Sequence, residues 1–417
     1  MVSARALIII ALRARAVEHA IEKLYPEEVA VVTSQESLEE VAVCCHELRR
    51  ERGVKFTYKP LDEAMEIGEA FRRFEDVLSQ FERRGYEHKD IVLDATGGTT
   101  PLRVGAALAA MMRNVQIVHQ RVKQDRYTGG GWQAYSSEDI ELLQMGNPLE
   151  ETGLLRAGQA VELFNRRDYG AAALVFEDIL QNVLGMERTH YYSGVLLLSE
   201  GYGAWDAADY PTALKRLSAA REELNVNFLA PALADRAAAL VNRIATNLPF
   251  LGKMIENGRE NLSLENVVDM VENARRRIVD QGRYDDGVAR LYRSVEMWHQ
   301  WRLQSYYSIS TKAVKWQEQV DEDIRKQFLE AVQTKELPRQ LGLKHARILD
   351  HLLEGKGLVD DAEFQGLLSA RNSSILAHGM IPIRPQTAEK FLKYLDALVV
   401  VPENLRVGAK HADLVVL

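Results

Sequence analysis

The sequence has few cysteines and no long apolar run, which argues against a disulfide-rich secreted domain and against a membrane-spanning protein. Its 417 residues include two cysteines, Cys44 and Cys45, which are adjacent and cannot form the disulfide framework of a small secreted domain. We expect this pair to fill an apolar core. The first apolar run ends at Leu12, before Arg13 and Arg15, so it is too short to span a membrane and is expected to form a β-strand. These features predict a cytoplasmic protein with no membrane partner.

The sequence also lacks the motifs of several enzyme classes. It contains no GxGxxG dinucleotide fingerprint, no GxxxxGK[ST] phosphate loop, no GxSxG elbow and no HExxH helix. No acidic cluster or Cys/His set has metal-ligand spacing, so we expect neither a metal nor a cofactor. Because 60 acidic residues outnumber 52 basic ones, giving a net charge of −8, a nucleic acid would need a local basic groove.

Short β-branched runs alternate with amphipathic helical patterns over the first 122 residues. This alternation predicts a mostly parallel sheet of five or six strands in a Rossmann-like α/β layer. The expected strands are Leu7–Leu12, Val29–Thr33, Val54–Tyr58, Ile91–Asp94 and Val115–Val118. The segment Gly131–Leu143 is strand-like at Trp132–Tyr135 and is expected to close the sheet as a hairpin after the glycines at 129–131. The expected helices are Val17–Tyr25, Leu38–Glu51, Ala64–Arg83 and Leu102–Met112.

The pattern changes to a helical period at Asn147-Pro148 and remains helical to the C-terminal region. We therefore predict an α/β domain over residues 1–146, an all-α connector over 147–260 and an all-α domain over 261–417. Three tyrosines each precede small residues, as at turns between paired helices, but their spacing does not fit a repeat array. We expect one helix to continue through His378 and another to cover Thr387–Val400. The apolar tail after it is expected to form a strand or a docking segment. The three tyrosines are Tyr169, Tyr210 and Tyr284.

A loop rich in glycine and threonine follows the predicted strand that ends at Asp94. Thr96, Gly97, Gly98 and Thr99 come next, and Pro101 suits the first turn of a helix. Glycines allow close approach of the backbone to a ligand, and hydroxyls and helix amides bind phosphate or ribose oxygens. The simpler interpretation is a capped turn. Because ligands of open parallel sheets bind at the carboxyl ends of the strands, we predict a ligand loop here.

Two other loops are expected at the same edge of the sheet. Thr33 and Ser34 follow the second predicted strand, and they either bind ligand or cap the next helix. Arg13 and Arg15 follow the first strand, and their guanidinium groups either meet phosphates or remain solvated. Together these loops predict a polar pocket.

A second set of polar residues lies near the C-terminal end of the predicted helical region. Arg371 and Asn372 precede His378 by about two helical turns, which would place them on nearly the same face. An arginine, an amide and an imidazole can hold a phosphodiester, stabilise its charged transition state and move a proton near neutral pH. This set predicts metal-independent cleavage in which the 2′-hydroxyl of RNA is the nucleophile. The alternative is a solvated arginine and a histidine at a helix end.

These two motifs, in this order, resemble those of the CRISPR-associated CARF-HEPN ribonucleases of type III systems. The stretch 94–99 is similar to the DxTGGT loop of CARF domains, and 371–379 resembles the RN-x-H ribonuclease motif of HEPN domains. The stretch 287–296 is similar to an early HEPN helix. The resemblance covers nearly the whole chain except the middle.

The resemblance implies a homodimeric endoribonuclease that cleaves single-stranded RNA and is activated by cyclic tetra- or hexa-adenylate. It carries over Arg371, Asn372 and His378 as catalytic residues, with a 2′,3′-cyclic phosphate as the product. The ligand residues that we assign are Thr96, Gly97, Gly98, Thr99, Thr33, Ser34 and Arg13. Many relatives have lysine where this chain has Thr100, so that contact is either absent here or replaced by Arg103, Arg13 or Arg15.

Three alternative functions remain open from the sequence. The first is a non-enzymatic CARF sensor whose helical half binds protein or nucleic acid. The second is a ring nuclease that cleaves its own activator at Thr96 or Thr99, alone or in addition to the RNase activity. The third is a toxin-like HEPN ribonuclease outside CRISPR defence, whose first domain senses another nucleotide.

Overall fold

A computed structural model describes residues 4–11, 13–60, 65–127, 135–257, 262–355 and 362–415. The chain divides into two compact units. The first contains residues 1–155 together with 182–184, and the second contains residues 156–181 together with 185–417. The unit boundary lies close to the predicted change of pattern at Asn147-Pro148, and the three-domain division stays a prediction.

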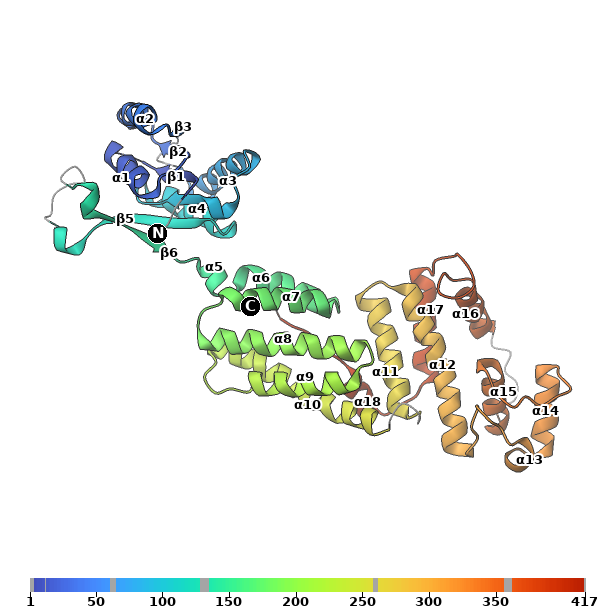
Figure 1. Cartoon of the computed structure of the whole chain (residues 1–417). Coiled ribbons are helices and arrows are strands. Elements are labelled where there is room, and N and C mark those ends of the chain that lie inside the picture. The colour runs from blue at the N-terminus through green and yellow to red at the C-terminus, as the bar shows by residue number, and fades with distance from the viewer. Residues whose placement is uncertain are drawn as a thin grey trace. The chain divides into compact units, whose positions relative to one another are not determined.

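The first unit is built on a six-stranded sheet in the order β3-β2-β1-β4-β5-β6 (Figure 1). Strands β1 to β5 are parallel, and β6 pairs with β5 antiparallel. The strands are β1 Ala6–Ile10, β2 Glu28–Thr33, β3 Lys55–Pro60, β4 Ile91–Asp94, β5 Gln116–Val122 and β6 Ile140–Met145. The predicted Rossmann-like α/β fold is therefore confirmed.

The strand that closes the sheet is β6, which overlaps the end of the predicted segment 131–143. Trp132 to Ala134 and the glycines at 129–131 lie outside the described residues. Tyr135 is described and is not part of a strand. Leu12, the predicted end of the first strand, and Ala64, the predicted start of a helix, also lie outside the described residues.

Alternating side chains of β1 explain how the sheet is covered on both faces. Ile8 and Ile10 belong to the core under α3 and α4, whereas Leu7 and Ile9 belong to the core under α1 and α2. This two-sided burial requires the continuous apolar run seen in the sequence. The helices of this unit are α1 Ala14–Leu24, α2 Leu38–Arg52, α3 Ile67–Arg83, α4 Thr100–Met112 and α5 Pro148–Glu151, with short helices η1 His88–Asp90, η2 Gln124–Arg126 and η4 Ser137–Asp139.

The two cysteines of α2 lie in this core, as predicted. Cys44 and Cys45 are buried and neither forms a disulfide. Burial raises the pKa of Cys44 to about 12 and that of Cys45 to about 11, so both thiols stay protonated at neutral pH.

The second unit is mostly helical, as predicted. Its helices are α6 Leu154–Asn165 (whose first two residues belong to the first unit), α7 Tyr169–Asn182, α8 Met186–Asp206, α9 Tyr210–Leu224, α10 Pro231–Glu256, α11 Leu264–Arg275, the π-helical turn η5 Arg276–Asp280, α12 Tyr284–Tyr307, α13 Trp316–Gln319, α14 Glu322–Val332, α15 Leu343–Leu353, α16 Ala362–Asn372, α17 Pro385–Leu398 and α18 Glu403–Ala409. None of the helices in the described ranges is long and apolar enough to cross a membrane.

The three tyrosine motifs mark the starts of helices. Tyr169, Tyr210 and Tyr284 are the first residues of α7, α9 and α12. In each case the residue two positions earlier has positive φ, which reverses the chain after the preceding helix. These residues are Arg167 at φ 61°, Ala208 at φ 61° and Gly282 at φ 65°. The tyrosines therefore belong to equivalent turns between paired helices.

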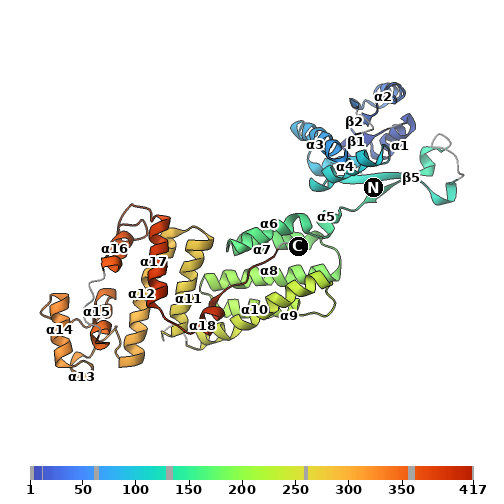
Figure 2. The ribbon, with the colours of Figure 1, turned by 180° about the vertical axis from the view of Figure 1, so that it is seen from behind.

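The apolar C-terminal tail docks on the helices between α6 and α10, and no strand forms in its described residues (Figures 1 and 2). Asn165 binds both backbone groups of Leu414, at 2.8 Å each. Tyr202 accepts a hydrogen bond from the backbone N–H of Ala412, and His411 stacks on its ring with the centroids 4.3 Å apart. Of the two forms expected for this tail, the docking segment is therefore correct. Its first part forms the short helix α18, so the helix predicted at Thr387–Val400 is not the last one.

Candidate functional site

The predicted catalytic residues lie at the end of α16 and in the turn that follows it. Arg371 and Asn372 are its last two residues, and His378 lies outside any helix. The prediction that the helix continues through His378 is therefore wrong. Asn372, Ser373 and Ser374 explain the early end, because short polar side chains compete with helical hydrogen bonds. We call residues 371–379 the RNH turn.

Backbone hydrogen bonds within the RNH turn bring the three predicted residues together. The N–H of His378 donates to the carbonyl oxygen of Asn372 at 3.3 Å, and the N–H of Ser374 donates to that of Arg371 at 3.0 Å. The side chain of Arg371 donates to Oδ1 of Asn372 at 3.1 Å. A reversing turn thus brings the backbones of these three residues close together, in place of the shared helix face that the spacing predicted.

Gly379 closes the RNH turn because its backbone packs directly on Ser373. A Cβ at this position would overlap the carbonyl oxygen of Ser373 and would lie 2.7 Å from its Cα. The N–H of Gly379 donates to the carbonyl oxygen of Ser374 at 3.1 Å, and the N–H of Ile381 donates to that of Ser373 at 3.1 Å. Glycine is therefore the residue that this turn accommodates without moving its backbone.

The catalytic candidates differ in exposure, and an aromatic ring that the sequence did not reveal contacts one of them. His378 and Asn372 are exposed, whereas Arg371 is half-buried. The Cζ atom of Arg371 lies over the ring of Tyr292, 4.3 Å from the ring centroid. Tyr292 belongs to α12, inside the stretch compared with an early HEPN helix. Its contact with Arg371 joins two distant segments, so sequence spacing carried no signal for it.

Apolar side chains surround the RNH turn on the surface. Ile375 and Leu376 are each 54% exposed, and Met380 is 88% exposed. Ile381, which follows, is also exposed. Several exposed apolar side chains within seven consecutive residues, beside polar catalytic candidates, are typical of a surface that another protein chain covers.

The predicted ligand loop in the first unit is organised by the buried carboxylate of Asp94. Its Oδ1 accepts hydrogen bonds from the backbone N–H and the hydroxyl of Thr96, and its Oδ2 accepts one from the side-chain amide of Gln120. The Thr96 hydroxyl in turn accepts the backbone N–H of Gln120 at 2.7 Å. Burial raises the pKa of Asp94, and these hydrogen bonds partly oppose the shift. The Thr96 hydroxyl therefore orders the loop and is already engaged as donor and acceptor.

Both glycines of this loop are required by its approach to the end of β1. A Cβ at Gly97 would overlap the carbonyl oxygen of Ile10, and one at Gly98 would lie 2.6 Å from the Cγ2 of Ile10. Gly98 also has φ of 86°, which favours glycine. Thr99 then precedes α4, whose first turn contains Pro101. The loop is half-buried and leads into a helix N-terminus, as expected for binding phosphate.

The other ligand candidates occupy the carboxyl ends of β1 and β2. Thr33 is buried, and its hydroxyl has no hydrogen-bond partner among the described residues. The Ser34 hydroxyl donates to that of Ser37 at 3.2 Å, before the start of α2. Arg13 is exposed and lies 3.7 Å from Glu40, whereas Arg15 pairs with Glu18 at 2.8 Å. The structure therefore places these candidates at one edge of the sheet, with Arg15 engaged by its own helix.

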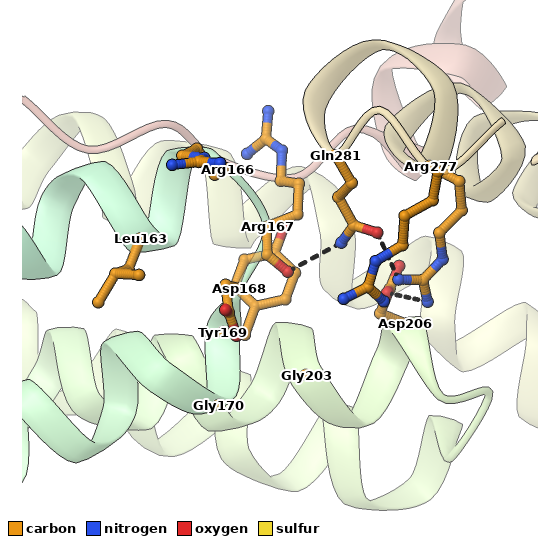
Figure 3. Close-up of a pocket in the computed structure, with 11 residues that line it drawn as sticks. Leu163, Arg166, Arg167, Asp168, Tyr169, Gly170, Gly203, Asp206, Arg277 and Gln281 are labelled. Atoms are coloured by element: carbon orange, nitrogen blue, oxygen red, sulfur yellow. Dashed lines mark hydrogen bonds and ion pairs between the residues drawn. The ribbon is translucent and has the colours of Figure 1, made fainter.

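A polar pocket of about 400 Å³ in the second unit contains neither set of candidates (Figure 3). Four arginines line it, from the turn before α7, from η5 and from the start of α12: Arg166, Arg167, Arg277 and Arg283. Arg167 pairs with Asp280 at 2.7 Å, and Arg277 pairs with Asp206. Because carboxylates neutralise these two arginines, we interpret the pocket as part of the joint between helical hairpins. No group of three or more His, Cys, Asp or Glu side chains in the described ranges is placed to hold a metal ion.

Comparisons with known proteins match both the connector and the region of the RNH turn. The model of the Csm6 6H domain matches residues 153–243, and that of the Csm6 HEPN domain matches residues 257–400. Together they cover more than half of the chain and include Arg371, Asn372 and His378. The chain belongs to the Csm6 family.

Proteins similar to this chain were found both among curated proteins and among solved structures. The Csm6 endoribonuclease of the CRISPR system of Thermus thermophilus is 25% identical over 355 residues, which cover 80% of this chain and 74% of the relative. Enterococcus italicus Csm6, solved with cyclic hexa-2′-fluoro-hexa-dAMP, covers 96% of this chain and 94% of its own at 12% identity and a TM-score of 0.47. Can2 from Sulfobacillus thermosulfidooxidans, solved with cyclic tetra-adenylate, covers 46% of this chain and 48% of its own at 14% identity and a TM-score of 0.25.

The family places an HEPN domain around the RNH turn. The matched HEPN segment contains helices α11 to α17 and the π-helical turn η5. The 6H segment contains the hairpins α6–α7 and α8–α9 with the first part of α10. Neither family model covers the ligand loop at 94–99.

Proposed function

We propose that this Csm6-family chain is a metal-independent endoribonuclease that cleaves single-stranded RNA at the RNH turn. The observation that carries the proposal is the reversing turn that brings Arg371, Asn372 and His378 together, with their side chains at least partly accessible. A curated relative, the Csm6 endoribonuclease of Thermus thermophilus, supports this proposal.

The chemistry follows from the properties of these three side chains. His378 removes the proton from the 2′-hydroxyl, and the 2′-oxygen attacks the adjacent phosphorus. The P–O5′ bond breaks, which leaves a 2′,3′-cyclic phosphate and a 5′-hydroxyl. Arg371 stabilises the charge that develops on the phosphate oxygens, and Asn372 orients Arg371 through its Oδ1. Because DNA lacks the 2′-hydroxyl, it is inert in this reaction.

A homodimer completes this site. One copy supplies one imidazole, whereas the reaction needs a base for the 2′-hydroxyl and an acid for the leaving 5′-oxygen. A two-fold axis beside the RNH turn would bring a second His378 and would bury the apolar side chains of that turn. A second apolar stripe lies on α4, where Val104, Leu108 and Met112 are exposed at spacings of four residues. These surfaces support self-association of each unit.

The proposed activator is a cyclic oligoadenylate bound at the loop 94–99 of the first unit. The loop lies at the carboxyl end of β4 and leads into the N-terminus of α4, which favours phosphate. Thr33, Ser34 and Arg13 lie at the neighbouring strand ends, and Thr96 holds the loop in shape. A symmetric ring matches a two-fold pocket formed by two such loops. The ligand activates the enzyme only if it binds the active arrangement more tightly than the inactive one.

Two variants test the catalytic assignment. Purified wild-type, Arg371→Ala and His378→Ala proteins are incubated with a fluorescent single-stranded RNA in EDTA, together with activating ligand. We expect cleavage by the wild type and loss of at least about 100-fold in each variant. Full cleavage by both variants would refute this site. Ligand binding without any cleavage would favour the non-enzymatic sensor. The additional ring-nuclease activity is tested by incubating His378→Ala protein with cyclic tetra-adenylate and measuring its linear product. Because this variant should lack RNase activity, ring opening is then measured apart from RNA cleavage.

A further inference from the structure

We propose that Tyr292 is a positioning residue for the RNase reaction, because its ring holds the guanidinium group of Arg371 in the RNH turn. The inference rests on the proposed function, in which Arg371 stabilises charge on the scissile phosphate. The contact is short, since Cζ of Arg371 lies 4.3 Å from the ring centroid. A cation at this distance over an aromatic face is attracted by the ring quadrupole.

The ring of Tyr292 is held in place by the helix and the core on which it packs. Tyr292 lies in the 24-residue helix α12 and packs against the core cluster of the HEPN region. Its neighbours Leu291 and Val295 in α12 are fully buried in that cluster. The RNH turn, by contrast, lies outside regular helices after Asn372. The contact therefore anchors a side chain at the edge of a turn to a rigid part of the fold.

Few other groups hold the Arg371 side chain. It donates one hydrogen bond to the neighbouring Asn372, and its Nε is buried without a hydrogen-bond partner among the described residues. Among the described residues, the side-chain contacts of Arg371 are with Asn372 and Tyr292, and no carboxylate is paired with it. Tyr292 thus stabilises the cation where an acidic side chain would ordinarily do so.

An aromatic ring suits this role better than a carboxylate. A carboxylate would occupy two N–H donors of the guanidinium group and neutralise its charge. The face of the ring attracts the guanidinium cation without occupying its N–H donors. Arg371 therefore keeps its full charge and its remaining donors for a phosphate oxygen.

Another arginine over aromatic rings of α12 shows the opposite arrangement. Arg302 lies over Trp298 and Tyr306, at 5.8 Å and 5.4 Å from their centroids. It also pairs with Asp350 at 2.9 Å and Glu354 at 3.0 Å, so its charge is used inside the protein. Arg302 therefore has a structural role, whereas Arg371 is held by an aromatic ring without being neutralised.

Four variants test the inference in the full-length protein. Tyr292→Phe keeps the ring, and Tyr292→Leu removes it. Tyr284→Leu is the matched control, because Tyr284 lies in the same helix and packs on the same core cluster. Arg371→Ala reports the proposed function independently. Steady-state cleavage of a fluorescent RNA, with activating ligand and EDTA, gives kcat and KM for each.

We expect Tyr292→Leu to lower kcat on the order of tenfold with KM for RNA little changed, since positioning acts on the charged transition state. Tyr292→Phe and Tyr284→Leu should stay within about twofold of the wild type. If Arg371→Ala is inactive while Tyr292→Leu retains full kcat, the role of Tyr292 is refuted and the proposed function stands. Equal losses in Tyr292→Leu and Tyr284→Leu would also refute it, because core packing would explain both. Full activity in Arg371→Ala would refute the proposed function itself.

Discussion

Substituting Gly379 by alanine should disable the RNH turn while leaving the rest of the fold in place. The added Cβ would overlap the carbonyl oxygen of Ser373 and would lie 2.7 Å from its Cα. Since non-bonded carbon atoms prefer separations of about 3.5–4.0 Å, the backbone must move by roughly 1 Å. Such overpacking costs about 1–3 kcal/mol when it cannot relax.

A shift of this size falls directly on the catalytic candidates. The residue before Gly379 is His378, and Ser373 follows Asn372, so the displacement separates the two ends of the turn. Misplacing reacting groups by about 1 Å lowers rates on the order of 100-fold. We therefore expect kcat of Gly379→Ala to fall about 100-fold.

The matched control is Gly366→Ala in the same segment. Gly366 lies inside α16, and a Cβ there would meet no atom within 4 Å. Alanine favours a helix over glycine by about 1 kcal/mol, so this variant should be at least as stable as the wild type and equally active. RNA cleavage and thermal unfolding are measured for both. If Gly379→Ala cleaves RNA within about twofold of the wild type, the account of the turn is refuted.

Three further perturbations address the ligand loop, the tail and the dimer. Thr96→Val removes one hydrogen-bond donor from Asp94 and leaves the N–H of Gln120 unpaired. Calorimetry should show weaker binding of cyclic oligoadenylate, and thermal unfolding should show a free energy of unfolding lower by about 1–3 kcal/mol. Unchanged values in both measurements would contradict the role of Thr96. Burial, together with the positive charges of Arg276 and Arg167, lowers the pKa of His411. A proton therefore binds this histidine more tightly in the unfolded chain than in the folded protein. The free energy of unfolding should then fall as the pH drops below about 6.5, by up to about 1.4 kcal/mol per pH unit. His411→Phe should flatten this slope in thermal unfolding between about pH 7.5 and 5.5, and an unchanged slope would count against it. Leu108→Asp should shift the protein toward monomer in sedimentation, unlike Val43→Asp on the exposed face of α2, and an intact dimer would exclude the α4 stripe as the interface.

The sequence was sufficient for those parts of the fold in which burial dictates the pattern. Fully buried strands such as β1 and β4 read as continuous apolar runs, and the tyrosine motifs lie at helix starts. Helices α1 to α4 lie close to their predicted ranges because their amphipathic periods are regular. The closing strand β6 overlaps only the end of the predicted segment 131–143, since alternation in a short edge segment is a weak signal of where a strand begins and ends.

The sites were predictable as sets of residues but not as geometry. The spacing of Arg371 and His378 suggested one helix face, whereas the polar residues between them end the helix and Gly379 closes a turn. The loop glycines were assigned to ligand approach, yet their close neighbours are atoms of Ile10. The contact of Tyr292 with Arg371 depends on how α12 and α16 pack, which no local pattern encodes.

The most direct test of the central claim measures RNA cleavage and its dependence on the activator in one experiment. Wild-type and His378→Ala proteins are incubated with a fluorescent single-stranded RNA in EDTA, with no ligand, with cyclic tetra-adenylate or with cyclic hexa-adenylate. One ring should stimulate cleavage by the wild type, and His378→Ala should remain inactive while still binding that ring. Cleavage that neither ring stimulates, or that His378→Ala retains in full, would contradict the central claim.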